Sequence, residues 1–291
     1  MSGVLAGLLC ALTWAIGSIS PKELSQKLDP LTLNAPRSLI AGLFALVVTL
    51  STGRAQAYQA ITLDKLAFLL ASVWIGGGLG DSAYIMSMAR IGVSRAFPIS
   101  STYPVLTLLF SILFLSEQPT WGMASGLALV LLGILFLSRT HDDTPVTPAT
   151  ARGGGVILAV LASVCCAASN VLVAPGARGL DPIMVASIRV PAISLVAWGA
   201  VAMRRTWPQL RALTRREWLY ILIGGLIGWG MGSMLFVYSV SAIGPARAAI
   251  LTSTAPLFAL PLSALVLKEK PTRATLFGSL LAVSGVALVS F

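Results

Sequence analysis

Residues 91–96 read Ile-Gly-Val-Ser-Arg-Ala, and residues 243–248, 152 positions later, read Ile-Gly-Pro-Ala-Arg-Ala. Charged residues and prolines are scarce in so apolar a chain, so their agreement in one register indicates a duplicated unit of about 150 residues. An internal repeat in a membrane protein is typical of transporters. The same offset of 152 residues matches further polar and helix-breaking residues, in the pairs Asp29/Asp181, Pro30/Pro182, Arg37/Arg189, Glu117/Glu269 and Gly126/Gly278.

Composition indicates an integral membrane protein. Charged residues make up 10% of the 291 residues and hydrophobic residues 56%, whereas a soluble domain carries about 25% charged residues. The net charge of +10 would suit nucleic-acid binding, but the basic residues lie mostly in short connections between apolar runs, so we expect none. The single histidine, His141, lies between the repeats. Neither a metal site nor a cofactor is therefore expected.

Apolar runs long enough to cross a hydrocarbon core of about 30 Å predict an all-α protein with ten transmembrane helices. The first repeat covers residues 1–138, a polar linker covers 139–154, and the second repeat covers 155–291. Five spans in each repeat require the second copy to enter the membrane upside down, which gives two inverted five-helix repeats (5+5). The predicted helices are 3–20, 31–50, 66–88, 94–115, 121–138, 155–175, 182–203, 217–240, 245–267 and 273–290.

Loop charges predict the orientation of the chain in a cell membrane (inner or plasma membrane). Basic residues gather in the linker and in the loops that would share its side, most densely in residues 204–216. Since basic loops stay in the cytoplasm, both termini are expected outside. The alternative is that loop charges drift and this one crowded loop decides the balance.

Several motifs resemble a known family. Asp29-Pro30 followed by Arg37, the stretch Ala-Arg-Ile-Gly-Val-Ser-Arg-Ala at 89–96, the region of Pro104 and Ser-Glu-Gln-Pro-Thr at 116–120 are similar to the EamA domain of the drug/metabolite transporter superfamily. The second copy repeats the pattern, with Lys-Glu-Lys-Pro-Thr at 268–272. The resemblance implies a ten-helix carrier that works by alternating access. Its central cavity would be lined mainly by helices one to four and six to nine.

This resemblance leaves the cargo open. Members of the superfamily move amino acids, drugs, organic anions, sugar nucleotides or phosphorylated metabolites, so the fold does not name a substrate. Many bacterial relatives place their N-terminus in the cytoplasm, and the loop charges of this chain indicate the opposite. The small multidrug proteins of the superfamily carry a glutamate in their first helix, where this chain offers Trp14 and Ser18. Export of lipophilic cations is therefore less expected.

Three ionisable residues fall inside predicted helices, where each charge costs about 2.5 to 3.5 kcal/mol on insertion scales. Asp81 is expected to bind a cationic group or a proton, and its repeat counterpart is Ser233. Arg37 or Arg189 is expected to bind a carboxylate or phosphate through two parallel hydrogen bonds. The alternatives are that the arginines anchor the helices and that Asp81 pairs with an arginine of a neighbouring helix.

Two further groups of residues are candidates for the transport path. Prolines interrupt helices four and nine, and freed carbonyl groups are tolerated in a bilayer where they line a polar path. These breaks are at Pro98, Pro104, Pro256 and Pro261. The other candidate lining residues are Trp14, Ser18, Tyr84, Tyr103, Asn170, Ser233 and Phe236. The alternatives are that the aromatic rings face lipid or core and that hydroxyl groups bond their own backbone.

The sequence thus predicts a secondary-active transporter that moves a small polar, zwitterionic or anionic metabolite, such as an amino acid. No nucleotide-binding motif is present, so the energy would come from a gradient or exchange, with protons as a candidate coupling ion. An enzyme is not expected, because a nucleophile with a base, or a metal cluster, is lacking. Alternatives are a promiscuous exporter of drugs or organic ions, and a channel or scaffold without turnover. The expected partners are the small-molecule substrate and the lipid bilayer, with the chain as a monomer or weak homodimer.

Overall fold

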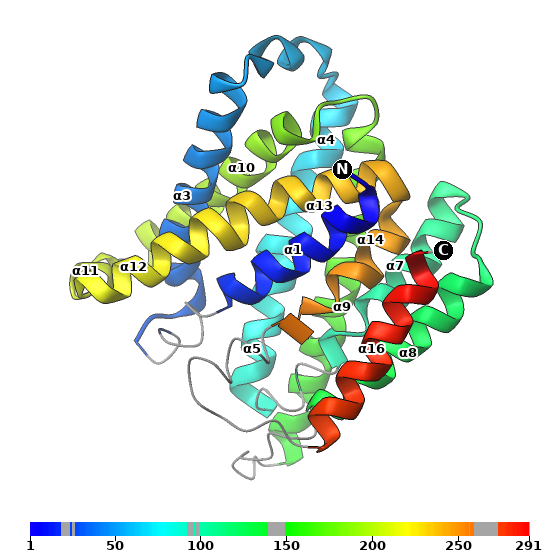
Figure 1. Ribbon diagram of the computed structural model, residues 1–291. Helices are drawn as coiled ribbons and strands as arrows, with labels where there is room; N and C mark the ends of the chain where they lie inside the picture. The colour runs from blue at the N-terminus through cyan, green and yellow to red at the C-terminus, as the bar shows by residue number, and fades with distance from the viewer. Residues whose placement is uncertain are drawn as a thin grey trace.

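The computed structural model describes residues 1–18, 24, 27–91, 96, 99–138, 149–255, 257–258 and 273–290. Every regular element in this part of the chain is a helix (Figure 1). Five helical stretches are long and apolar enough to cross a membrane: Leu31–Ser51, Leu63–Met88, Gly153–Ala177, Pro182–Arg204 and Arg215–Ile243. Shorter apolar helices accompany them, at Gly3–Gly17, Tyr103–Leu115, Trp121–Phe136 and Leu280–Val289.

The helices of the first half follow the expected ranges with two interruptions. A turn at Ser101 and Thr102 precedes α7, and a π-helix divides the third predicted span. The elements are α1 Gly3–Gly17, α3 Pro30–Ser51, the 3-10 helix η1 Arg54–Ala60, α4 Leu63–Val73, the π-helix η2 Trp74–Gly80, α5 Asp81–Ile91, α7 Tyr103–Leu115 and α8 Trp121–Ser138.

The second half contains the corresponding helices. Helix α9 begins at Ala149, so the end of the predicted linker 139–154 is helical; Gly155 packs there against Ile91 of α5. The elements are α9 Ala149–Ala177, α10 Pro182–Arg204, α11 Trp207–Arg211, α12 Arg215–Ile223, the π-helix η3 Gly224–Met231, α13 Gly232–Ile243, α14 Pro245–Thr252 and α16 Arg273–Ser290.

Helices α3 and α10, which contain matched residues of the two copies, pack against each other in opposite directions. Each begins with an aspartate cap followed by proline, a strong helix-start signal. The Asp29 carboxylate lies 3.7 Å from Nη1 of Arg204, the last residue of α10, and the Asp181 carboxylate lies 3.0 Å from Nε of Arg54, which follows the end of α3. The start of each helix is therefore tied to the end of the other.

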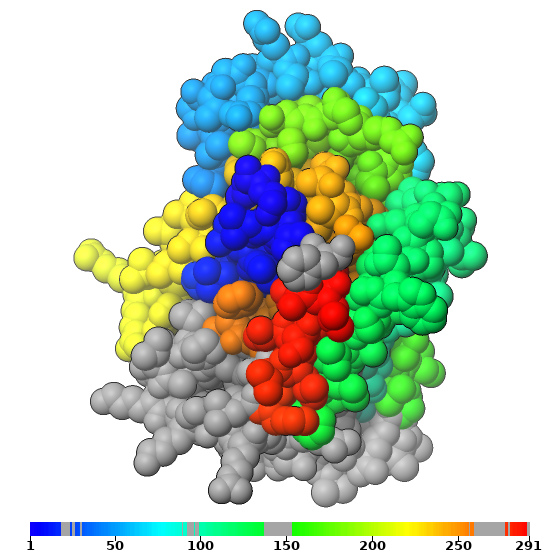
Figure 2. Space-filling view, turned by 45° about the vertical axis from the view of Figure 1, so that its right-hand side comes forward, coloured from blue at the N-terminus to red at the C-terminus, as the bar shows by residue number. Residues whose placement is uncertain are grey.

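Glycine pairs hold α8 and α16 together. A Cβ atom added at Gly126 would lie 2.6 Å from the carbonyl oxygen of Gly285, and one at Gly133 would lie 2.6 Å from that of Gly278. These four glycines thus bring the backbones of the two helices into close contact. Figure 2 shows α16 in red alongside α8 in green.

The two π-helices occupy matched places in their copies. Glycine-rich segments, Trp-Ile-Gly-Gly-Gly-Leu-Gly and Gly-Gly-Leu-Ile-Gly-Trp-Gly-Met, replace a continuous α-helix, since glycine weakens the α-helical ladder and π-segments often mark functional sites. Gly228 of η3 packs on Gly17 of α1, and Gly76 of η2 packs on Ser169 of α9. The two contacts are equivalent, because Gly17 corresponds to Ser169 and Gly228 corresponds to Gly76 by the offset of 152 residues.

Glu117 contacts the start of α14. Its carboxylate reaches the start of α14, where a side chain at Gly244 would collide with it, and Gly244 has a positive φ of 83°. Burial raises the pKa of Glu117, and the charge of Arg247 opposes that shift. An acid at a helix N-terminus complements the helix dipole.

Candidate functional site

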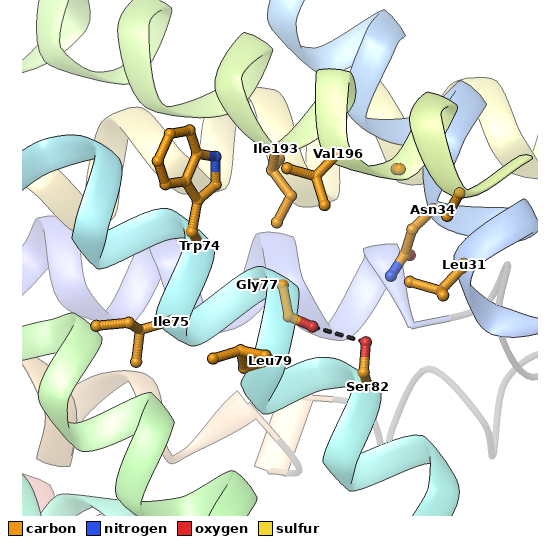
Figure 3. A pocket seen from close by; sticks show the side chains of 12 residues that line it. Leu31, Asn34, Trp74, Ile75, Gly77, Leu79, Ser82, Ile193 and Val196 are labelled. Atoms are coloured by element: carbon orange, nitrogen blue, oxygen red, sulfur yellow. Dashed lines mark hydrogen bonds between the residues drawn. The ribbon is translucent and has the colours of Figure 1, made fainter. Parts of the chain in front are cut away.

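A cavity of about 350 Å³ lies between α3, η2 with the start of α5, and α10 (Figure 3). Three of its lining side chains carry polar atoms, and each forms a hydrogen bond within the protein. Ser82 Oγ donates to the carbonyl of Gly78 over 2.6 Å, Trp74 Nε1 donates to Ala192 over 3.4 Å, and Asn34 Oδ1 accepts from Arg37 over 3.1 Å. The cavity is therefore mainly apolar, and Asn34 connects it to a buried charge.

Arg37 is that charge, with 6% of its surface exposed. Its Nη1 donates to Asn34 Oδ1, and its Nη2 donates to the carbonyl of Gly17 over 3.2 Å. Its Nε is buried without a hydrogen-bond partner. The guanidinium is also attracted by the carboxylate of Asp81.

Asp81 is the first residue of α5, directly after the π-helix η2. It is half-buried, and its charge acts on Arg37, Tyr84 and Cys166. Within the described part of the chain it forms neither a hydrogen bond nor a direct ion pair. The structure thus brings Asp81, Arg37 and Tyr84 into one electrostatic group, with the carboxylate oxygens open to a further partner.

Arg189 occupies the matched place on α10 and is 7% exposed. Its Nε donates to Ser72 Oγ over 3.0 Å, and its Cζ lies 5.9 Å from the centre of the Phe236 ring. Trp14 extends this aromatic surface, with its ring centre 5.7 Å from that of Phe236. Among the described residues no acidic side chain pairs with Arg189, and its two terminal nitrogens donate no hydrogen bond.

In the described part of the chain, the remaining predicted residues form no hydrogen bond with Asp81, Arg37 or Arg189. Tyr103 Oη donates to the carbonyl of Ala249 over 3.4 Å, and Asn170 Nδ2 donates to Thr107 Oγ1 over 3.4 Å. Ser18 is exposed and bonds the carbonyl of Ala15 in its own helix. Ser233 is half-buried on α13.

The helix breaks are matched where the structure describes them. Pro104 is buried in the first turn of α7, after the turn at 101–102, and a second turn at 253–254 follows α14. The hydroxyls of Thr102, Ser253 and Thr254 bond carbonyl groups three residues earlier, as in the alternative reading of these residues. Pro98, Pro256 and Pro261 lie outside the described residues.

Sequence reasoning missed the residues that hold the two arginines. Asn34 stands three residues before Arg37, a spacing that places both side chains on one helix face and could have identified this contact. Ser72 lies 117 residues from Arg189, so no local pattern indicates it. Across the described ranges no cluster of three or more His, Cys, Asp or Glu side chains could hold a metal ion.

Comparison with known proteins places this arrangement in a family. Residues 1–139 and 153–291 match the EamA-like transporter family. An uncharacterized transporter of Archaeoglobus fulgidus is 23% identical over 93% of this chain and 91% of its own length. Protein LicB of Haemophilus influenzae is 25% identical over the full chain and 98% of its own length. A protein of known crystal structure aligns with a TM-score of 0.80 at 17% identity, over 98% of this chain and 95% of that one, which shows a shared fold.

Apolar helices of membrane-spanning length and this family match together identify a multi-pass membrane protein involved in transport. The relative from Archaeoglobus fulgidus is itself named as a transporter. The chain belongs to the EamA-like transporter family, within the drug/metabolite transporter superfamily.

Proposed function

We propose that the protein is a secondary-active transporter that moves a small anionic or zwitterionic metabolite by alternating access. In this proposal residues 1–138 and 155–291 are two inverted five-helix repeats that rock about a central site. The antiparallel packing of α3 on α10, and the matched contacts Gly17–Gly228 and Ser169–Gly76, support it. A pseudo-two-fold axis of this kind is the usual architecture of such carriers.

The observation that carries the proposal is the environment of Arg189. A buried guanidinium is costly to desolvate, and buried charges are normally paired. In the described structure Arg189 has a hydroxyl and an aromatic ring but no acid, with two N–H-bearing nitrogens left without a partner. A carboxylate or phosphate of the cargo would supply the missing countercharge through a bidentate contact.

Asp81 takes a second role in the proposal. Its carboxylate is attracted by Arg37 but not bonded to it, so a proton or a cationic group can compete for it. Asp81 lies nine residues after Ser72 in the helical stretch Leu63–Met88. At the α-helical rise this corresponds to a separation of about 13 Å. We therefore assign the cargo's anionic group to Arg189, and we assign coupling or the cationic group to Asp81.

The test is a counterflow assay with purified protein in liposomes, using amino acids, organic anions, phosphorylated metabolites and lipophilic cations as cargo. The proposal predicts saturable counterflow of an anionic or zwitterionic class that is lost in Arg189→Gln. Arg204→Gln is the matched control, because Arg204 is on the same helix but exposed at the end of it. Selective counterflow of lipophilic cations, or equal activity in both variants, would contradict the proposal.

A further inference from the structure

The apolar cavity beside η2 has no equivalent packing space at the matched place in the other copy. A Cβ atom added at Gly78 would meet nothing within 4 Å, whereas one added at Gly230, its counterpart, would lie 2.8 Å from Cδ1 of Phe44. In the most apolar part of each span, 28% of the residues are buried in Leu63–Met88 and 44% in Arg215–Ile243. The same glycine therefore faces open space in one copy and an aromatic ring in the other.

A single pair of matched residues explains this difference. Phe44 of α3, which fills the space at Gly230, corresponds by the offset of 152 residues to Val196 of α10. Val196 lines the cavity, together with Gly78. A valine side chain has no aromatic ring and is smaller than phenylalanine. Val196 of α10 therefore leaves empty the volume at Gly78 that corresponds to the volume filled by Phe44 of α3 at Gly230. The cavity is thus encoded in the sequence.

The lining of the cavity selects an apolar occupant. Asn34 Oδ1, Ser82 Oγ and Trp74 Nε1 are hydrogen-bonded to the protein, and none of the lining residues is charged. An apolar cavity of this kind stays dry and binds apolar groups. A water-soluble polar ligand would find no charge there to replace its hydration.

The surroundings of the cavity indicate where that occupant comes from. Its walls are α3, η2 with the start of α5, and α10. All of them belong to helical stretches that are long and apolar enough to cross a membrane. Leu79 and Trp74, on the cavity wall, are 64% and 46% exposed. Both residues lie near the middle of Leu63–Met88, where the surroundings of a membrane-spanning helix are expected to be bilayer hydrocarbon.

We propose that an acyl chain of a bilayer phospholipid occupies the cavity between α3, η2 and α10, in the place that Phe44 fills in the other copy. The chain packs against Gly78 and Val196 as the Phe44 ring packs against Gly230. This lipid site is independent of the cargo charge at Arg189.

The experiment uses the full protein in nanodiscs that contain a phosphatidylcholine with a photoreactive diazirine in the middle of one acyl chain. After illumination, mass spectrometry of peptides maps the labelled residues. The proposal predicts labelling concentrated in 74–82 and 193–200, and its loss in Val196→Phe, which restores the ring. Leu195→Phe is the matched control, since Leu195 is 77% exposed beside the cavity and its labelling pattern should not change.

Gly78→Leu fills the cavity from the opposite wall and serves if Val196→Phe does not fold; size-exclusion and circular dichroism establish folding. Wild-type labelling that avoids both segments would overturn the proposal. So would undiminished labelling in a folded cavity-filling variant. Displacement of the label by a water-soluble cargo would instead assign the cavity to the apolar part of that cargo, and would also overturn it.

Discussion

Arg37 and Arg189 are the same residue in two copies of one unit, yet their surroundings differ. Arg37 donates to Asn34 and to the carbonyl of Gly17, and it is attracted by Asp81. Arg189 has Ser72 and the ring of Phe236, and no acid in the described structure. The difference teaches that duplication determined the backbone, whereas later substitution of neighbouring residues determined the chemistry of each site.

Three substitutions account for most of that divergence. Asp81 corresponds to Ser233, Tyr84 to Phe236, and Val196 to Phe44. The first gives one arginine a countercharge, the second removes the hydroxyl from an aromatic ring that both copies keep, and the third opens a lipid-facing cavity. The arginines are therefore matched in position and differ in the groups that surround them.

The largest expected effect comes from neutralising each arginine in turn. Arg189→Gln should lower cargo affinity about 100-fold, because a charge-assisted bidentate contact is worth about 3 kcal/mol. The apparent Tm without cargo should not fall, since an unpaired buried charge is removed. Binding titrations and thermal unfolding of the purified variant measure the two quantities.

Arg37→Gln, unlike Arg189→Gln, should lower the stability of the folded protein. It removes the countercharge of Asp81 and the hydrogen bond from Arg37 to the Gly17 carbonyl, so the folded state should lose about 3 kcal/mol. Thermal unfolding would show a fall in apparent Tm of several degrees. Equal losses of stability in Arg37→Gln and Arg189→Gln would refute the claimed asymmetry.

The next effect concerns Asp81. Asp81→Asn keeps the shape of the side chain but cannot exchange a proton, so the pH dependence of transport should disappear while membrane insertion stays intact. Uptake into liposomes at several pH values measures this. Asp64→Asn is the control, because Asp64 is an exposed acid in the first turn of α4, on the same rod. If Asp81→Asn transports like the wild type at every pH, Asp81 has no part in coupling.

A smaller effect compares two helical glycines. Gly133→Ala would place a methyl group 2.6 Å from the carbonyl of Gly278, so it should destabilise α8 against α16 by about 2 kcal/mol. Gly199→Ala meets nothing within 4 Å. It should raise stability by about 0.5 kcal/mol because alanine favours the helix. Thermal unfolding of both variants in one detergent distinguishes packing from propensity.

The smallest effect concerns the matched ends of α3 and α10. Asp29→Ala and Asp181→Ala each remove a helix cap that accepts two backbone N–H groups, and each should cost about 1 kcal/mol. Arg54→Gln and Arg204→Gln remove only partly exposed ion pairs and should cost about 0.5 kcal/mol. If the loss of stability differed strongly between Asp29→Ala and Asp181→Ala, the starts of α3 and α10 would not be equivalent.

Much of the fold could be predicted because apolar length and helix-start signals are local. Helix α8 and the start of α10 lie where the sequence predicts them, since Pro-Thr before Trp121 and Asp-Pro at 181–182 act over a few residues. The π-helices and the break before Tyr103 could not be predicted in detail, because they depend on contacts such as Gly228 on Gly17. Periodicity alone does not distinguish a π-segment from an α-helix.

The site could be predicted only in part. An ionisable residue within an apolar helix is visible in the sequence because such residues are rare there. Asp81, Arg37 and Arg189 could therefore be found from the sequence. Which arginine has a countercharge depends on contacts between distant segments, such as Ser72 with Arg189. The cavity at Gly78 was not anticipated, although the Val196/Phe44 difference is visible once the repeats are aligned.

The most direct test of the central claim is a chemical double-mutant cycle at Arg189. Isothermal titration would compare the cargo with an analogue whose anionic group is replaced by a neutral amide, in wild type and in Arg189→Gln. The account predicts that the wild type prefers the anionic cargo about 100-fold and that the variant binds both alike. An undiminished preference in Arg189→Gln would show that the anionic group binds elsewhere and would contradict the account.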